Sequence, residues 1–293
     1  MDKKVNIEDI WNESAGEISP RTFRELLSLS KRIEATEARS RRRRNFVSAL
    51  AIAASLAIVA SVTFTLTRKE YSVSPLDSTS NLVADYGQIS SITLDDGTVV
   101  HLNSGSTLLY PAEFKGGNRI VFLTGEGNFD VAKDPSRPFI VKTAHMDVQA
   151  LGTSFCVQSY AGDNTVRTTL REGKVKVDVD AVNDKSYFLD PGMQLIYTPS
   201  GKTVSLAIVD AEKVMSWENG YLTFSNATFA EIAKSLERRF NVSISYSSDN
   251  IRKNSLNVRF VPEDTLEDAL GVLTILIPGS KYRIEGNRVY YHF

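Results

Sequence analysis

The sequence has little of the chemistry that metal and cofactor sites require. Among its 293 residues there is one cysteine, Cys156, and there are three histidines, His101, His145 and His292, which lie far apart. A single cysteine excludes an intramolecular disulfide framework and a thiolate-rich zinc or iron–sulfur site, and the histidines show no ligand spacing. We therefore expect neither a metal nor a cofactor.

An excess of charge of either sign is also missing. Lys and Arg number 34 against 35 Asp and Glu, which gives a net charge of -1. This balance argues against a generally basic nucleic-acid binder, so we expect no direct contact with nucleic acid. The 42% hydrophobic and 24% charged composition is that of an ordered globular chain, and the length fits two domains.

Motifs of the common enzyme classes are absent. There is no G-x-S-x-G, no H-E-x-x-H and no phosphate-binding loop. The Gly-Glu-Gly sequence at 125–127 lacks the third glycine of a dinucleotide fingerprint and opens no helix. The carboxylates available for an acid–base pair include Asp95, Asp96, Glu126 and Asp130, and most of them lie in turn sequences, where Asp and Gly are expected on backbone grounds. We expect no catalytic residues and no enzymatic activity.

What the sequence does have is one long apolar run. Residues 45–66 contain no Asp, Glu, Lys, Arg, His, Pro or Gly, and ten of the 22 are Leu, Ile, Val or Phe. As a helix they would reach about 33 Å, enough for a hydrocarbon core of about 30 Å. The ten apolar residues favour insertion by about 3 to 6 kcal/mol before the polar residues are counted. The run predicts a single transmembrane helix.

Two other readings of this run are a cleaved signal peptide and a buried core helix. A signal peptide has a short basic start and an apolar run of about 7 to 15 residues, whereas 44 residues precede this run. A core helix is usually shorter and carries polar residues on one face. Both fit less well than a membrane span.

The flanks of the span predict its orientation. The 15 residues before it hold seven basic side chains and the 15 after it hold two. Because basic flanks stay in the cytoplasm, we expect a single-pass protein of the bacterial inner membrane, with a cytoplasmic N-terminus and periplasmic C-terminal domains. The run Arg41, Arg42, Arg43 and Arg44 could be a nucleic-acid patch, but directly beside a span we expect it to rest on anionic lipid headgroups.

Residues 1–44 form a short arm with two amphipathic helical patterns. The apolar positions fall at i, i+3 and i+4 in each; they are Ile7, Ile10 and Trp11, and then Phe23, Leu26 and Leu27. Two such helices cannot build a core alone, so we expect these faces to dock into a groove on a partner. The alternative is a disordered tail with incidental helicity.

The remaining sequence predicts a linker, an all-β domain and a small α+β domain. Residues 67–84 are polar and read as the linker. From 85 to 209 short strands alternate with glycine turns, and the Asp95-Asp96-Gly97 turn between 92–94 and 99–102 indicates a hairpin. The apolar pattern changes phase along 146–160, which predicts one strand with a β-bulge at Gly152. On that strand we interpret Cys156 as a small packing residue or an inert thiol.

From about residue 210 to 293 the pattern is βαββαββ. Strands at 221–224, 242–246 and 256–260 alternate with helices near 230–240 and 266–273, and strands at 282–284 and 289–291 form a hairpin through Gly286-Asn287. We expect two helices on one face of a small sheet. Exposed sheet edges in such a domain suit strand addition by a partner.

Several motifs resemble the FecR-type transmembrane anti-sigma sensors of Bacteroidetes. They are ITLDDGTVVHLNSGSTLLYP, LTGEGNFDVAKDPSRPFIVKT, VQALGTSFCVQSY and LREGKVKV, and they occur in that order. The end of the chain, from WENGYLTFSNATFAEIAKSLERRFNVSI onward, is similar to the short N-terminal domain of secretins and TonB-dependent receptors. The resemblance covers about residues 85–293. The chain departs from it at His101, where the family often has Trp, at Cys156, where it often has Asn, and in its shorter arm.

The resemblance implies a signalling role. A cytoplasmic segment would bind an extracytoplasmic-function sigma factor, and the periplasmic domains would contact the signalling extension of an outer-membrane TonB-dependent receptor. Uptake of a ligand, often an iron chelate or a glycan, would trigger release through an intramembrane protease. The alternative is a membrane-anchored periplasmic scaffold or glycan-binding module without a transcriptional role.

Overall fold

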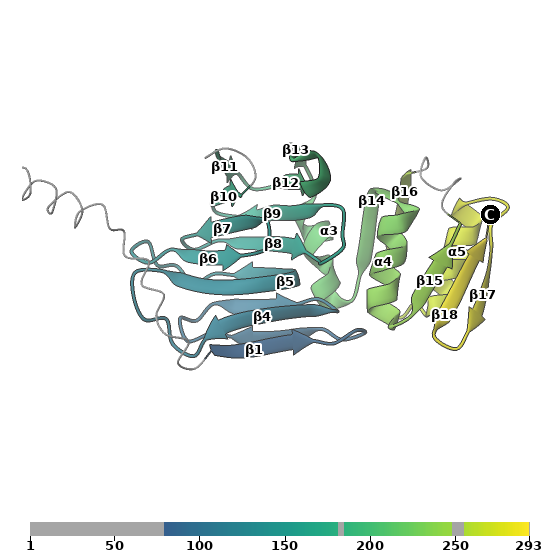
Figure 1. The fold of residues 1–293 in the computed structure, drawn as a ribbon, viewed down its shortest axis with the longest axis horizontal. Helices are drawn as coiled ribbons and strands as arrows, with labels where there is room; N and C mark the ends of the chain where they lie inside the picture. Colours follow the sequence, from purple (N-terminus) through teal and green to yellow (C-terminus); the bar gives the residue numbers. More distant parts are fainter. Residues whose placement is uncertain (1–78, 181–184, 248–254, 293) are drawn as a thin grey trace, which may run out of the picture. The chain divides into compact units, whose positions relative to one another are not determined.

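The computed structural model describes residues 79–180, 185–247 and 255–292. The cytoplasmic arm and the membrane span expected at 1–44 and 45–66 lie outside these residues. No helix within the described part of the chain is long and apolar enough to cross a membrane. The described residues form an all-β domain, a connecting segment and a small α+β domain, as Figure 1 shows.

The all-β domain begins earlier than the sequence indicated. Residues 79–84, which we assigned to the linker, form strand β1, which pairs antiparallel with β4. The strands are β1 (Thr79–Ala84), β2 (Ser90–Thr93), β3 (Val99–Leu102), β4 (Ser106–Pro111), β5 (Arg119–Asp130), β6 (Phe139–Lys142), β7 (Met146–Ala150), β8 (Ser154–Ser159), β9 (Val166–Glu172), β10 (Val175–Val179), β11 (Ser186–Leu189), β12 (Met193–Thr198) and β13 (Thr203–Ile208). A short 3₁₀ turn, η1 (Pro199–Gly201), joins the last two.

Strand β5 is the central strand of this domain and pairs with four others. Its first half pairs with β4 and, in parallel, with β6, whereas its second half pairs with β3 and β8. The main strand order is β11-β10-β7-β6-β5-β8-β9-β12-β13, and Figure 1 shows β5 between β4 and β6. The change of partners falls at Gly125, whose φ of 110° is in the range that side-chain-bearing residues rarely adopt.

The expected hairpin at the start of the domain is confirmed. Strands β2 and β3 pair antiparallel through the Asp-Asp-Gly turn, and the side chain of Asp96 accepts a hydrogen bond from the Thr98 backbone N–H at 3.0 Å. Side chains of the turn thus accept hydrogen bonds from the backbone of the same turn. Because these contacts are local, the hairpin could be predicted from a few neighbouring residues.

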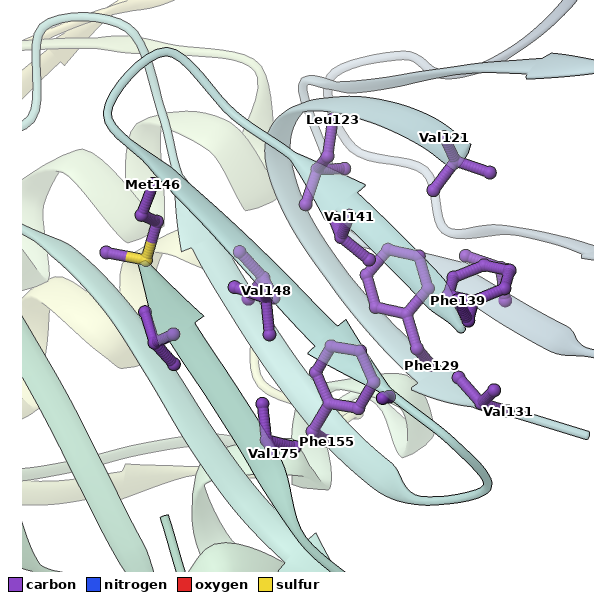
Figure 2. Close-up of a cluster of buried hydrophobic side chains, with 14 of the residues drawn as sticks. Val121, Leu123, Phe129, Val131, Phe139, Val141, Met146, Val148, Phe155 and Val175 are labelled. Atoms are coloured by element: carbon purple, nitrogen blue, oxygen red, sulfur yellow. The ribbon is translucent and has the colours of Figure 1, made fainter. Parts of the chain in front are cut away.

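The core of the β domain is aromatic at its centre. The Phe129 and Phe155 rings stack with centroids 5.3 Å apart, and Phe139 lies 6.1 Å from Phe129. Figure 2 shows these rings among the buried side chains of the neighbouring strands. Burial of such rings removes large apolar areas from water, which stabilises the folded domain.

The expectation of one bulged strand over 146–160 was wrong. The chain forms two strands that are not neighbours, because β7 pairs with β6 and β10 whereas β8 pairs with β5 and β9. Gly152 lies between them with a φ of 141°, and a Cβ there would stand 2.8 Å from Cα of Lys133. The change of phase in the apolar pattern therefore marks the place where the chain leaves β7 and enters β8, which pairs with other strands of the sheet.

The α+β domain has the predicted order of elements. It contains β14 (Leu222–Thr228), α4 (Phe229–Phe240), β15 (Ser243–Tyr246), β16 (Ser255–Phe260), α5 (Leu266–Leu276), β17 (Lys281–Glu285) and β18 (Arg288–His292). Both helices begin with a capping box, Thr228 with Glu231 and Thr265 with Asp268. The strands, however, form two sheets, β14-β16 and β15-β18-β17, and not the single small sheet that we expected.

Candidate functional site at the junction of the two domains

None of the residues that the sequence suggested for partner binding lies in the described part of the chain. The apolar faces of the arm, with Ile7, Ile10, Trp11, Phe23, Leu26 and Leu27, and the Arg41, Arg42, Arg43 and Arg44 run all precede residue 79. They remain predictions. Within the described residues, several polar contacts between distant parts of the chain join the β domain to the connecting segment and the α+β domain.

The connecting segment is itself packed onto the β domain. It consists of α3 (Ala211–Met215), which Asp210 caps, and the 3₁₀ helix η2 (Ser216–Asn219). Met215 and Trp217 are buried, and α3 contacts strand β9. A connection that buries a methionine and a tryptophan is held in place, in contrast to a flexible linker.

Asn128 on β5 fixes this segment through both of its amide hydrogens. Its Nδ2 donates to the backbone oxygen of Met215 at 3.1 Å and to Oε2 of Glu218 at 2.9 Å. Arg171 on β9 reinforces the contact, because it pairs with Asp130 at 2.8 Å and lies 3.8 Å from the Glu218 carboxylate. Buried polar groups of this kind require defined partners, so they favour one arrangement of the segment.

Helix α4 makes the second set of contacts. The Arg238 guanidinium lies 3.8 Å from the centroid of the Tyr160 ring and 3.4 Å from the carboxylate of Asp163. Lys234, one turn earlier, donates to the same carboxylate at 3.0 Å and to the Gly162 backbone oxygen at 2.6 Å. Arg238 and Asp163 are largely buried, which strengthens both the ion pair and the cation–π contact relative to exposed examples.

Two further contacts fix the ends of α4. At its start, Arg167 on β9 donates to Oε1 of Glu231, whose other oxygen accepts from the Thr228 N–H at 2.9 Å. Partial burial tends to raise the pKa of Glu231, but the hydrogen bonds from Thr228 and Arg167 outweigh it and hold the pKa below its usual value. Near its end, the Gly87 N–H donates to the Arg238 backbone oxygen at 2.8 Å.

A carboxyl and a thiol lie close together on neighbouring strands of the β domain. Glu126 accepts from Nδ2 of Asn103 at 2.8 Å and from Sγ of Cys156 at 3.7 Å. Burial raises the pKa of Glu126 despite the Asn103 hydrogen bond. Burial also raises the pKa of the Cys156 thiol, and the adjacent Glu126 charge adds to this effect. A protonated, enclosed thiol is unreactive, which agrees with our interpretation of Cys156 as a packing residue.

The junction consists of hydrogen bonds, ion pairs and one cation–π contact. No group of three or more His, Cys, Asp or Glu side chains within the described residues could hold a metal ion. Three charged side chains of α4, those of Glu231, Lys234 and Arg238, instead contact the β domain. Sequence reasoning missed this face because Glu231, Lys234 and Arg238 have the spacing of a solvated helix surface. The alternating acidic and basic residues on this short helix are the one sequence feature that could have indicated a buried, paired face.

The fold and the junction together define a class of two-domain protein, in which a short connecting segment joins an all-β domain to a βαββαββ domain. Comparison with known families agrees. The FecR protein family matches residues 80–176, and the FecR, C-terminal family matches residues 221–291. The chain belongs to the FecR family.

Solved structures give the same assignment. Two crystal structures, at 1.65 and 2.50 Å resolution, are of a protein from Parabacteroides distasonis ATCC 8503 described as a candidate anti-sigma factor. Both are 32% identical to this chain with a TM-score of 0.68; the aligned region covers 72% and 73% of this chain and 98% of each crystallised chain. No curated protein matches the chain.

Proposed function

We propose that this FecR-family protein is a single-pass inner-membrane anti-sigma regulator. Its cytoplasmic arm binds an extracytoplasmic-function sigma factor. Its periplasmic domains receive a signal from the periplasmic extension of an outer-membrane TonB-dependent receptor, and proteolysis within the membrane releases the sigma factor.

The observation that carries this proposal is the order of segments along the chain. An arm with two amphipathic sequence patterns precedes an uncharged 22-residue run with a strongly basic flank, and both FecR regions follow that run. Such an order separates the arm from the FecR domains by one membrane. The description of the related crystal structures supports an anti-sigma role for the chain.

The junction gives the signal a physical route. The α+β domain exposes the outer edges of β15 and β17, which lie at the two sides of its three-stranded sheet, and strand addition there is the recognition mode that we propose for the receptor extension. Arg238 pairs with Asp163 across the two domains, and Asn128 holds the connecting segment, so we expect a displacement of one domain to act on the other.

Capture of the sigma factor is the first test. The full chain in mild detergent should co-purify with the sigma factor encoded beside its gene. Trp11→Asp and Leu26→Asp should each weaken the complex at least about tenfold, because a charge in an apolar groove costs several kcal/mol unless it is paired. Ile275→Asp, at a position 78% exposed on α5, is the matched control and should leave capture unchanged.

Failure of the full chain to capture that sigma factor would contradict the cytoplasmic half of the proposal. The alternative role as an anchored scaffold or glycan-binding module makes the opposite prediction for the arm. If that role is correct, deletion of residues 1–38 leaves function intact, whereas an anti-sigma regulator lacking them alters transcription of its target genes.

The periplasmic half has its own test. Calorimetric titration of the full chain with the isolated periplasmic extension of the cognate receptor should give saturable heat. No heat, together with intact sigma-factor capture, would remove the receptor from the proposal and leave the anti-sigma role standing.

A further inference from the structure

The hydrophobic cores of the two domains are separate. Each domain has its own cluster of buried apolar side chains, and among the described residues none belongs to both clusters. Phe129 and Phe155 lie in the cluster of the β domain, whereas Ile232 and Leu236 turn the inner face of α4 into the cluster of its own domain. Burial of apolar surface therefore holds each domain together without joining the two.

Helix α4 meets the β domain mainly through charged side chains. Three ion pairs join them; they are Arg167–Glu231, Lys234–Asp163 and Arg238–Asp163. Two of these pairs therefore share one carboxylate, that of Asp163, in the connection between β8 and β9. The contact depends on a few charges and not on a large apolar surface, and charges respond to their ionic surroundings far more than apolar burial does.

These ion pairs lie within reach of dissolved salt. The Glu231 and Lys234 side chains are 38% and 35% exposed, whereas Asp163 and Arg238 are more enclosed. The range of a charge in water falls from about 10 Å at 0.1 M salt to about 3 Å at 1 M salt. The backbone hydrogen bond from Gly87 to Arg238 does not depend on charge, but one such bond is a weak hold on a whole domain.

Gly220 lies where the connecting segment ends and β14 begins. Its N–H donates to the Trp217 oxygen at 2.8 Å, on the segment that the β domain holds, and its own oxygen accepts from Arg239 of α4 at 2.9 Å. Its φ is 81°, and glycine adopts positive and negative φ with similar ease. One longer bond, from the Tyr221 N–H to the Ser216 oxygen at 3.3 Å, crosses this residue. A rotation at Gly220 would move α4 and leave the connecting segment in place.

We propose that the three ion pairs of α4 form an ionic latch and that Gly220 is its hinge. The structure shows the closed arrangement, in which Asp163 and Arg167 hold α4. When these pairs break, the α+β domain rotates away about Gly220 while both cores stay folded. The connecting segment stays on the β domain, because its hydrogen bond from Asn128 to Glu218 does not involve α4.

The latch gives the chain two arrangements that differ little in free energy. Opening it exchanges a few ion pairs for water and leaves both hydrophobic clusters intact, so a modest difference in binding can shift the balance between the arrangements. Opening also frees Lys234 and Arg238 for carboxylates other than Asp163. This device requires neither a sigma factor nor a receptor, so it goes beyond the proposed function and does not depend on it.

A distance between two spin labels tests the latch in the full chain, held in mild detergent. The labels are placed on Leu109→Cys in β4 and Ile275→Cys in α5, which are exposed positions in different domains, and the native Cys156 is buried. At about 0.05 M salt we expect one main distance, and at about 1 M salt a second distance whose population has risen at least about fivefold. Identical distance distributions at both salt concentrations would overturn the proposal.

Asp163→Asn opens the latch without added salt. It removes two of the three ion pairs and leaves Lys234 and Arg238, two like charges one turn apart, without their shared partner. At low salt the second distance should be at least about tenfold more populated than in the unsubstituted chain. Asp190→Asn makes the same chemical change in the exposed Lys174–Asp190 pair and should match the unsubstituted chain. An unshifted distance in Asp163→Asn would refute the latch.

Hydrogen exchange distinguishes opening from unfolding. In Asp163→Asn at low salt, the backbone amides of Phe129 in β5 and Leu236 in α4 should keep the protection that they have in the unsubstituted chain. The Tyr221 N–H, whose bond crosses the hinge, should exchange at least about tenfold faster. Acceleration at Leu236 equal to that at Tyr221 would mean that the α+β domain unfolds, and the proposal would then be wrong.

Discussion

Arg119 is the largest side chain that the β domain encloses completely. Its Nη1 donates to the Asp96 carboxylate at 2.7 Å and to the Ala132 backbone oxygen at 2.9 Å, and its Nε donates to the Arg137 backbone oxygen at 2.9 Å. A buried cation is tolerated only with such partners. The pair therefore fixes the Asp-Asp-Gly hairpin to the first residue of β5.

Removal of the acidic partner should be costly. Asp96→Ala leaves the Arg119 charge buried without its counter-ion, so we expect the free energy of unfolding to fall by about 3 to 5 kcal/mol in chemical denaturation. Glu113→Ala, which breaks the exposed Glu113–Lys115 pair, is the control and should change it by less than about 1 kcal/mol. Similar losses for the two variants would contradict this account of Arg119.

Glu126 should give stability a pH dependence of the opposite sign to that of most carboxylates. Its pKa is raised above the ordinary 4.5, so the folded chain holds this proton more tightly than the unfolded chain. Stability then falls as pH rises from the unfolded pKa of 4.5 through the higher folded value. Glu126→Gln should raise the melting temperature at neutral pH and give no advantage below that unfolded pKa. Parallel curves of melting temperature against pH for the two chains would contradict the raised pKa.

At the scale of elements, Gly125, where the partner strands of β5 change, lies at a position that has no room for a side chain. A Cβ there would lie 2.3 Å from Oγ and 2.6 Å from Cα of Ser106, and its φ is unfavourable for any other residue. Gly125→Ala should therefore destabilise the chain by about 3 kcal/mol or more. Gly117→Ala, at a position with nothing within 4 Å and no positive φ, should be nearly neutral. Thermal unfolding of the two variants measures the difference, and equal melting temperatures would show that Ser106 can move aside.

Helix α4 should be energetically coupled to the β domain. In a double-mutant cycle of Asp163→Ala and Arg238→Ala, we expect a coupling of about 1 to 3 kcal/mol in the free energy of unfolding, because the two charges are in contact and largely shielded from water. The same cycle on the exposed Arg283–Glu285 pair should give less than about 0.5 kcal/mol. Additive effects of Asp163 and Arg238 would mean that the two domains do not communicate through this pair.

An element could be predicted from the sequence when the residues that determine it lie close together along the chain. The β2–β3 hairpin and both helices of the α+β domain follow from turn residues and 3.6-residue periodicity within a few positions. The separation of β7 from β8 depends on which distant strands they join, and the division of the α+β strands into two sheets depends on the same kind of contact. Pairing between residues far apart in sequence leaves no periodic signal, so these features required the structure.

The same reasoning explains the site. The partner-binding arm is predicted from apolar periodicity, which is a local signal, and it stays a prediction. The junction depends on Asn128, Asp163 and Arg238, which lie on separate elements and are polar residues of common types. Their role is visible only where the fold brings them together.

At the scale of the whole molecule, the prediction concerns which compartments the two ends occupy. A reporter active only in the cytoplasm should function when fused before Met1, and one active only in the periplasm should function after Phe293. The basic flank at 30–44 is the physical reason, since it resists transfer across the membrane. The control is a pair of fusions with the two reporters exchanged between the ends, and neither reporter should then be active. Activity of both ends in one compartment would overturn the proposed topology and the relay that depends on it.

The anchored connecting segment has a mechanical consequence. Tension applied at the α+β domain would enter the β domain at Asn128, near the far end of β5, and not through a slack tether. Because β5 is bonded to four strands, the load at Asn128 would spread over several hydrogen-bond ladders at once. The contacts of α4 with Asp163 and Arg167 carry load in parallel, so under force the two domains would separate only after both sets of contacts had broken.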